Sequence, residues 1–327
     1  MIQILLLAIS PFWFSVSTPA HASLRGLAVP SKDVIWASGT EGTWLLSTDA
    51  GAHWRSGRVP GAETLDFRDI AARDAQHALL LASGAGVKSR IYQTNDAGEH
   101  WTLLFENPDP QGFFDAFDFW DRSHGILLGD PVDGHFAIFT TQDGGQTWQR
   151  QTGPRALADE GAFAASGTCL AIFASADAWF GTGGSHPHIF HSSDRGRTWT
   201  ATDVPLGDGS PASGVFSLFL KERTQVIAVG GNYTRQDDSR RSLAVTENGS
   251  KWLSGNGLSG YRSAVAGVPK VRLVISVGTN GSDISQDGGR SWSPLPVEGM
   301  NAVAASPDGT VWAAGAHGAI ARLNLGH

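Results

Sequence analysis

Apolar residues along the chain occur in short runs that recur about every 45 residues. Each unit predicts an apolar opening strand, a second strand that often ends in glycine, a third strand, and a fourth that begins at a tryptophan. Short runs rich in β-branched and aromatic residues, bounded by Gly, Asp and Ser, are typical of β-strands. The expected opening strands lie at 24–27, 67–70, 114–117, 163–171, 215–218, 261–264 and 300–303.

Four short strands in a period of this length are typical of one blade of a β-propeller. Seven opening strands therefore predict an all-β fold, a seven-bladed β-propeller. A closed ring leaves only short strand edges exposed, whereas a solenoid of the same repeats needs covered ends.

One octapeptide marks the turn before the fourth strand of most units. It has Ser or Thr, then Asp two residues later, Gly two after that, and Trp three residues further on. The spacings between successive aspartates are 47, 47, 51 and 93 residues, and a shortened copy, with Asn248 in place of Asp and ending at Trp252, fills the longest gap. The five full copies contain Asp49, Asp96, Asp143, Asp194 and Asp287, and end at Trp54, Trp101, Trp148, Trp199 and Trp292.

These octapeptides match the Asp-box of BNR repeats, and their chemistry is that of a turn. The carboxylate can accept hydrogen bonds from backbone N–H groups, the glycine can take a backbone angle closed to other residues, and the tryptophan can fill the space between sheets. We therefore expect the aspartates and tryptophans of the octapeptides to be structural.

Composition agrees with a turn-rich array and excludes one class of function. Glycine accounts for 41 of 327 residues, and only 17% of residues are charged, against about 25% in average domains. The net charge of -7 argues against nucleic-acid binding, which needs a concentrated basic surface. The single cysteine, Cys169, excludes an internal disulfide and is expected to be a small buried residue.

The first residues predict export. An apolar run at 2–14 is too short for a transmembrane helix and suits the core of a signal peptide, and Ala20-His21-Ala22 offers a cleavage site. The segment before the run has no Lys or Arg, so a wrongly assigned start codon is the alternative. We expect residues 1–22 to be a signal peptide and residues 23–327 a single propeller domain, a periplasmic or extracellular monomer without a transmembrane segment after cleavage.

Cleavage after Ala22 would leave little chain ahead of the first opening strand. The seventh unit ends soon after its third strand, so a fourth strand would have to come from the N-terminus. Either residues 14–18 are retained as that strand, or the seventh blade has only three strands.

Several stretches of the chain resemble one known family over essentially all of residues 23–327. The chain's repeated Trp-Ala-x-Gly strands and Thr-x-Asp-Gly-Gly-x-Thr-Trp turns resemble those of the photosystem II stability and assembly factor family of Asp-box propellers. The chain is most similar to uncharacterised exported bacterial members, often labelled oxidoreductase or glycosyl hydrolase. Shared segments include 23–27, 66–69, 129–134, 160–170, 230–234 and 260–264.

This resemblance implies a non-catalytic scaffold that binds protein partners or assists assembly through an arginine-rich surface. The chain departs from the family in its charge, because Lys and Arg number 24 against 31 Asp and Glu. This departure argues against a chlorophyll-protein client, and we expect the partner to be a protein client or an anionic ligand on the channel face.

The implied fold also predicts which polar residues gather on one face. In a propeller, the start of each innermost strand and the loop after each second strand lie on the face opposite the Asp-box turns. This face is expected to bind the ligand through Arg25, Arg68, Arg262, Asp115, Asp130, Asn232, Tyr233 and Asn301.

Three arginines at matching positions suggest an anion site, because guanidinium groups bind carboxylate or phosphate through two parallel hydrogen bonds. The alternative is that each arginine pairs with a local acid such as Asp69 or Asp115 and merely lines a wet channel.

An enzyme is the second hypothesis. Arginines in this number occur in sialidase-like glycoside hydrolases, but the Phe/Tyr-Arg-Ile-Pro signature is absent. A tyrosine nucleophile would have to be Tyr92, Tyr233 or Tyr261, and Tyr233 is the best placed. Asp115 with Asp130 or Glu160 could supply the carboxyl pair that glycoside hydrolysis requires. Binding of an anionic glycan without turnover belongs to the same hypothesis.

No metal or cofactor is expected. His186 and His188 are too few to hold zinc without further ligands. The sequence has no Gly-x-Gly-x-x-Gly that opens a helix and no Cys-x-x-Cys-His, so it offers no motif for a dinucleotide or haem.

Overall fold

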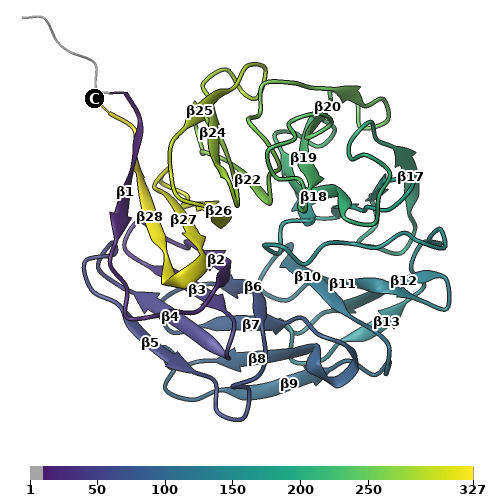
Figure 1. Ribbon diagram of the computed structural model, residues 1–327. Helices are drawn as coiled ribbons and strands as arrows, with labels where there is room; N and C mark the ends of the chain where they lie inside the picture. The colour runs from purple at the N-terminus through teal and green to yellow at the C-terminus, as the bar shows by residue number, and fades with distance from the viewer. Residues whose placement is uncertain (1–9, 327) are drawn as a thin grey trace, which may run out of the picture.

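The structure is a computed structural model that describes residues 10–326. These residues form seven four-stranded antiparallel sheets, arranged as the blades of a ring around a central axis (Figure 1). The prediction of a seven-bladed, all-β propeller is confirmed. Within the same range the helical elements are two 3-10 turns, η1 (Gly86–Lys88) and η2 (Ala316–Gly318). No helix in residues 10–326 has the length and apolar character needed to span a membrane.

Each blade follows the order predicted from the sequence, from an innermost to an outermost strand. The innermost strands of blades one to seven are β2 (Leu24–Ala28), β6 (Phe67–Ala72), β10 (Phe114–Phe119), β14 (Leu170–Phe173), β18 (Ser213–Leu220), β22 (Ala264–Gly267) and β26 (Met300–Ala305). The second strands are β3 (Ile35–Gly39), β7 (Ala78–Ala82), β11 (Gly125–Val132), β15 (Asp177–Gly181), β19 (Val226–Asn232), β23 (Val274–Gly278) and β27 (Val311–Gly315).

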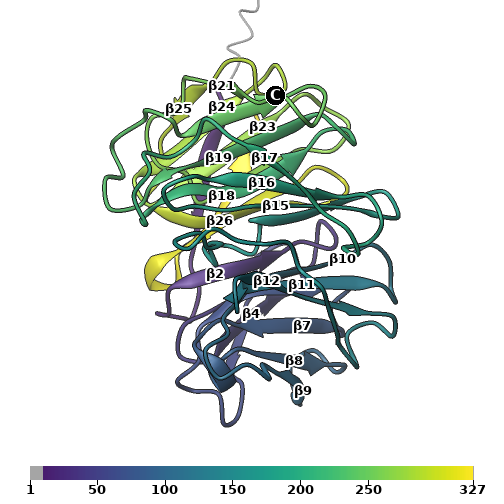
Figure 2. The same cartoon turned by 90° about the vertical axis from the view of Figure 1, so that its right-hand side faces the viewer.

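The third strands are β4 (Thr43–Ser47), β8 (Arg90–Thr94), β12 (His135–Thr141), β16 (His188–Ser192), β20 (Leu243–Thr246), β24 (Gly281–Ser285) and β28 (Ile320–Asn324). The outermost strands are β5 (Arg55–Arg58), β9 (Thr102–Glu106), β13 (Gln149–Gln151), β17 (Thr200–Asp203), β21 (Leu253–Ser254), β25 (Ser293–Leu295) and, in blade seven, β1 (Phe12–Val16). Figure 2 shows β7, β8 and β9 side by side as successive strands of blade two.

The hydrophobic core is divided among the interfaces between neighbouring blades. Trp44 of blade one packs with Phe67 of blade two, and Leu45 of blade one packs with Trp312 of blade seven. Each sheet therefore buries both of its faces against the sheets beside it, which explains why the second and third strands are apolar along most of their length.

The octapeptide turns have the hydrogen bonds that their sequence predicts. In the first copy, the Ser47 hydroxyl donates to Asp49 Oδ1 at 2.9 Å, and the backbone N–H of His53 donates to the same oxygen at 2.9 Å. The N–H of Gly51 donates to Ser47 Oγ, and Trp54 Nε1 donates to the carbonyl of Gly51. The Asp and Ser/Thr bonds recur around Asp96, Asp143, Asp194 and Asp287.

The turn glycine of the first copy also permits contact between blades. Gly51 has a φ of +82°, and a Cβ built on it would lie 2.3 Å from the ring of Trp312 in blade seven. Trp54 meets the same ring edge to face at 6.2 Å. Of the other octapeptide tryptophans, Trp148, Trp252 and Trp292 are buried, and Trp101 and Trp199 are half-buried.

Strand β1 closes the ring by pairing with β28, from Phe12 opposite Asn324 to Val16 opposite Ile320 (Figure 1). Trp13 packs against the core between blades six and seven. Blade seven thus has four strands, and the N-terminal one begins two residues earlier than the expected 14–18. The predicted signal peptide spans this strand, and residues 1–9 of it lie outside the described residues.

Two opening strands differ from the prediction. In blade four the strand begins at Leu170 rather than at 163, because residues 161–168 cross the central channel instead of pairing with β15. In blade six it begins at Ala264 rather than at 261, because the preceding residues are held by contacts with the blade's third strand and a neighbouring loop.

Candidate functional site

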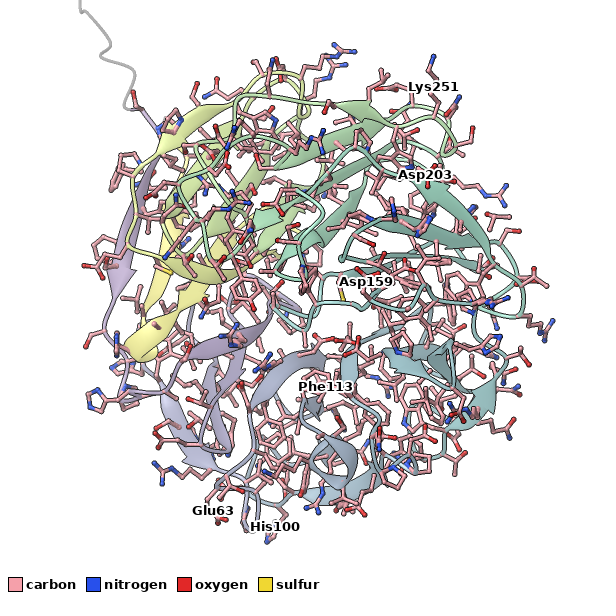
Figure 3. The ribbon with its side chains drawn as sticks, turned by 45° about the vertical axis from the view of Figure 1, so that its right-hand side comes forward. Glu63, His100, Phe113, Asp159, Asp203 and Lys251 are labelled. Carbon is pink, nitrogen blue, oxygen red and sulfur yellow. The ribbon has the colours of Figure 1, made fainter. Side chains whose placement is uncertain are left out.

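A cavity of about 490 Å³ lies at the mouth of the central channel, on the face opposite the octapeptide turns. It lies among the starts of the innermost strands and the loops that follow second strands. Figure 3 places Phe113, one of its lining residues, near the axis of the ring, whereas His100 of an octapeptide turn lies at the periphery. A cavity of this size is in the range of ordinary ligand sites.

A β-bulge in five blades aims one side chain at this cavity. The pairing of the innermost strand with the second strand skips the second residue of β2, β6, β10 and β26 and the fourth residue of β18. A bulge leaves one residue out of the ladder and redirects its side chain. The skipped residues all line the cavity, and they are Arg25, Arg68, Asp115, Phe216 and Asn301.

The two arginines differ in their partners. Arg68 Nε donates to Asp66 Oδ2 at 2.8 Å, and its Nη1 donates to the carbonyl of Ala164 at 3.3 Å. Arg25 is half-buried, and its Nε is buried without any acceptor among the described residues. Burial and the neighbouring Arg68 guanidinium lower the pKa of Arg25. Arg25 is therefore the cation available to an added anion.

Asp115 is a cavity carboxyl that has no hydrogen-bond partner among the described residues. Its side chain is 1% exposed, and neither of its oxygens accepts a hydrogen bond from the described residues. Burial raises the pKa of Asp115 well above its ordinary value, Asp130 raises it further, and Arg68 offsets only part of this effect. Asp130 Oδ1 accepts the N–H of Ala162 at 3.0 Å, and burial raises the pKa of Asp130 to about 6.

Aromatic rings from blades four to six form the opposite wall. Phe163 stacks on Phe216 with centroids 3.8 Å apart, and Tyr261 meets Phe216 edge to face at 4.8 Å. Tyr233 lies 6.2 Å from Phe216 and is 50% exposed. This cluster of rings is separate from the cores between blades. The wall offers apolar area at the rim that a ligand can cover.

Residues 161–168 form the floor of the cavity. Besides its bonds to Arg68 and Asp130, this segment reaches blade six, where Ser166 Oγ donates to the carbonyl of Ser263 at 3.0 Å. Gly167 makes the crossing possible, because it has a φ of +75° and a Cβ on it would lie 2.1 Å from the carboxylate of Asp69.

A second cavity of about 420 Å³ lies on the other side of the crossing segment, toward the octapeptide face. Asp69 and Asp118 line it. Asp69 Oδ2 accepts the N–H of Phe117 in blade three, and Oδ1 accepts the N–H of Ile70. Burial raises the pKa of Asp69 to about 8. Because its oxygens tie two inner strands together, the role of Asp69 is structural.

The structure places three of the predicted site residues elsewhere. Arg262 is fully buried, and its guanidinium binds Asp283, with Nε 2.7 Å from Oδ2. Asn232 donates to Asp208 at 2.9 Å, and Glu160 accepts hydrogen bonds from Thr182 and His188. None of the three lines the cavity. Arg262 pairs within its own blade because it precedes β22 rather than occupying a bulge in it.

The other predicted residues, Arg25, Arg68, Asp115, Asp130, Tyr233 and Asn301, line the cavity together. Asn301 also ties blade seven to blade one, because its Nδ2 donates to the carbonyl of Leu24 at 2.9 Å. Sequence reasoning missed Phe163 and Phe216, and it named Tyr261 only as a possible nucleophile. Phe216 could have been found, because it is the second residue of the predicted opening strand 215–218, as Arg25 is of the predicted opening strand 24–27.

The described residues contain no group of three or more His, Cys, Asp or Glu side chains arranged to hold a metal ion. His188 lies between Glu160, 2.9 Å from Nδ1, and Asp203, 3.3 Å from Nε2. The groups that the cavity offers to a ligand are Arg25, the carboxyls of Asp115 and Asp130, and the aromatic wall.

No family model matches the chain, and no curated protein matches it. Solved structures do. YCF48 bound to a D1 peptide aligns with a TM-score of 0.66 at 16% identity, covering 95% of this chain and 96% of that one. YCF48 from Cyanidioschyzon merolae aligns with a TM-score of 0.68 at 15% identity, covering 95% and 98%.

U3-55K aligns almost as well, with a TM-score of 0.66 at 14% identity, covering 96% of this chain and 98% of that one. Identities this low are evidence of a common fold only. The chain therefore has the seven-bladed propeller fold of the photosystem II assembly factor YCF48, in agreement with the resemblance seen in its sequence.

Proposed function

We propose that the protein is a non-catalytic scaffold that binds a polypeptide partner at the cavity on its channel face. The observation that carries this proposal is Asp115, a buried carboxyl with no hydrogen-bond donor, together with the unpaired Nε of Arg25 in the same cavity. Buried polar groups in proteins nearly always have partners, so two groups without protein partners in one cavity support a binding site there. A structure of YCF48, which shares the fold, contains a bound D1 peptide.

Site-specific photocrosslinking tests this function. Tyr233→p-benzoylphenylalanine places a photoreactive ring at the exposed rim of the cavity, and His100→p-benzoylphenylalanine places the same group on an octapeptide turn as the control. We expect a crosslinked polypeptide, identified by mass spectrometry, from the Tyr233 variant alone. Adding Arg25→Gln should reduce its yield. Equal crosslinking from both positions would contradict the proposal.

A glycoside hydrolase is the second candidate, because Asp115 and Asp130 form a pair of carboxyls with raised pKa values in one cavity. Such a pair can act as general acid and base on an acidic sugar. Turnover of an acidic glycoside that is lost in Tyr233→Phe or Asp130→Asn would favour this function over the scaffold.

We also propose that the protein is exported to the periplasm or beyond, that its octapeptides are BNR repeats, and that it acts as a monomer. An exported chain cut after Ala22 would have a three-stranded blade seven, whereas a chain that keeps Phe12–Ala22 has the four strands described above. Intact-mass analysis of exported protein distinguishes these forms, and sedimentation analysis of the same material measures its oligomeric state.

A further inference from the structure

The cavity is divided by chemistry among the blades. Blades one and two contribute cations, Arg25 and Arg68, and blade three contributes the carboxyls of Asp115 and Asp130. Blades four to six contribute the aromatic wall around Phe216. A ligand that fills the cavity therefore meets a cation, an acid and an apolar surface at different points of its circumference.

Some of these charged side chains already have hydrogen-bond partners within the protein, and others do not. Arg68 is held by Asp66, and Asp130 is held by the N–H of Ala162. Arg25 Nε and both oxygens of Asp115 have no partner among the described residues. The ligand therefore needs an acceptor, best an anion, for Arg25 and a cationic nitrogen donor for Asp115, because a neighbouring positive charge lowers the pKa of that buried carboxyl and favours its ionised form.

The two groups without partners, Arg25 and Asp115, lie on blades that are not adjacent. Arg25 belongs to blade one and Asp115 to blade three, with Arg68 of blade two between them. A free amino acid carries its ammonium and carboxylate on one carbon, whereas a peptide can carry the two charges on different residues, with about 3.3–3.6 Å of chain per residue between them. Groups on two non-adjacent blades therefore favour a peptide.

We propose that the cavity takes a short peptide segment that carries an acidic side chain for Arg25, an amine for Asp115, and an apolar side chain for the wall at Phe216. The inference rests on the proposed function, and it specifies the charges of the partner. An acidic ligand without an amine would leave Asp115 without a donor. A basic ligand without an acidic group would be repelled by the Arg25 guanidinium.

Blocked pentapeptides test the inference. A set of six contains glutamate, phenylalanine and lysine in every order between terminal glycines, each with a fluorophore for anisotropy measurements. The tightest binder is then compared with forms in which glutamine replaces glutamate or methionine replaces lysine. Because hydrogen bonds to charged groups are among the stronger ones, we expect each neutral form to bind the wild-type protein at least roughly tenfold more weakly.

Protein variants assign each charge to its partner. Arg25→Gln should bind the glutamate and glutamine peptides alike and still distinguish lysine from methionine. Asp115→Asn should show the reverse. The controls Arg58→Gln and Asp203→Asn replace exposed residues on outer strands and should behave as the wild type. Figure 3 shows Asp203 away from the centre of the ring. Unfolding midpoints close to wild type would confirm that both cavity variants fold.

The outcomes separate the inference from the function on which it rests. If Tyr233 crosslinks to a polypeptide but neutral peptides bind as well as charged ones, the inference is overturned and the scaffold stands. If neither crosslinking nor peptide binding occurs, both are overturned. Binding of free L-phenylalanine as tightly as the best pentapeptide would overturn the separation of charges along a peptide.

Discussion

Ring closure by β1 gives a quantitative prediction. Trp13 is half-buried against the core between blades six and seven, and its Nε1 donates to Ser282 Oγ at 2.9 Å. Phe14, its neighbour on β1, is 62% exposed. Trp13→Ala and Phe14→Ala therefore remove large aromatic side chains from the same strand, one from a packed position and one from solvent.

The expected cost follows from burial. Truncating a fully buried tryptophan to alanine costs about 3–5 kcal/mol, so half-burial reduces the contribution to about 2 kcal/mol. Loss of the hydrogen bond to Ser282 adds about 1 kcal/mol. We expect Trp13→Ala to lower the free energy of unfolding by about 2–3 kcal/mol in sum, and Phe14→Ala to change it by about 0.5 kcal/mol or less, as exposed positions do.

Urea unfolding followed by far-ultraviolet circular dichroism measures both variants in the full chain. A second sample that begins at Ser23 lacks β1, and it also loses the hydrogen bond from Gly318 N to the carbonyl of Ala22. It should be less stable than Trp13→Ala. Equal stability of the two alanine variants, or a chain from Ser23 as stable as the full chain, would refute the closure of the ring by β1.

Four further outcomes are expected. Asp143→Ala removes an octapeptide carboxylate that accepts the N–H and hydroxyl of Thr147, and should cost about 1–3 kcal/mol without changing peptide affinity; a binding defect at unchanged stability would contradict this. Arg262→Gln breaks a buried ion pair with Asp283 and should cost about 3–5 kcal/mol, measured by urea unfolding beside the nearly neutral Arg25→Gln. Burial raises the pKa of Asp130 from 3.8 to about 6, so the folded chain keeps a proton that the unfolded chain has lost; stability should fall as pH rises through this window, and Asp130→Asn should flatten the fall in a pH series of unfolding curves. Burial also raises the pKa of the Cys169 thiol, so iodoacetamide should label it only after unfolding, and rapid labelling of the folded chain would disprove its burial.

The repeating sequence determined the fold because each unit specifies its own turns and strands locally. The octapeptide around Asp49 forms within eight residues, and Ser47, Gly51 and Trp54 find their partners inside the same turn. A local motif that recurs at a constant spacing also fixes equivalent positions in successive blades. For this reason the sequence alone predicts Arg25 and Arg68 on one face of the ring, where both line the cavity.

Arg262 was predicted to bind the ligand beside Arg25 and Arg68, but it is buried in an ion pair. By sequence it occupies the same place after an aromatic residue as Arg68, but its guanidinium reaches Asp283, on the third strand of its own blade, and Asn280 beside it. The energy of burying a charge is decided by the partners that surround it. Those partners lie 18 and 21 residues away, so only the tertiary structure shows that this arginine is a structural one.

The floor and the wall of the cavity were likewise decided by tertiary structure. Residues 163–168 were predicted to be part of a strand, yet they cross the channel, where Gly167 passes Asp69 of blade two and Ser166 donates a hydrogen bond to blade six. Phe163 joins Phe216 only because of this crossing. Alternation of apolar and polar residues specifies which side chains are buried, but it does not specify what they are buried against. Contacts between blades that are far apart in the sequence determine which residues these side chains pack against.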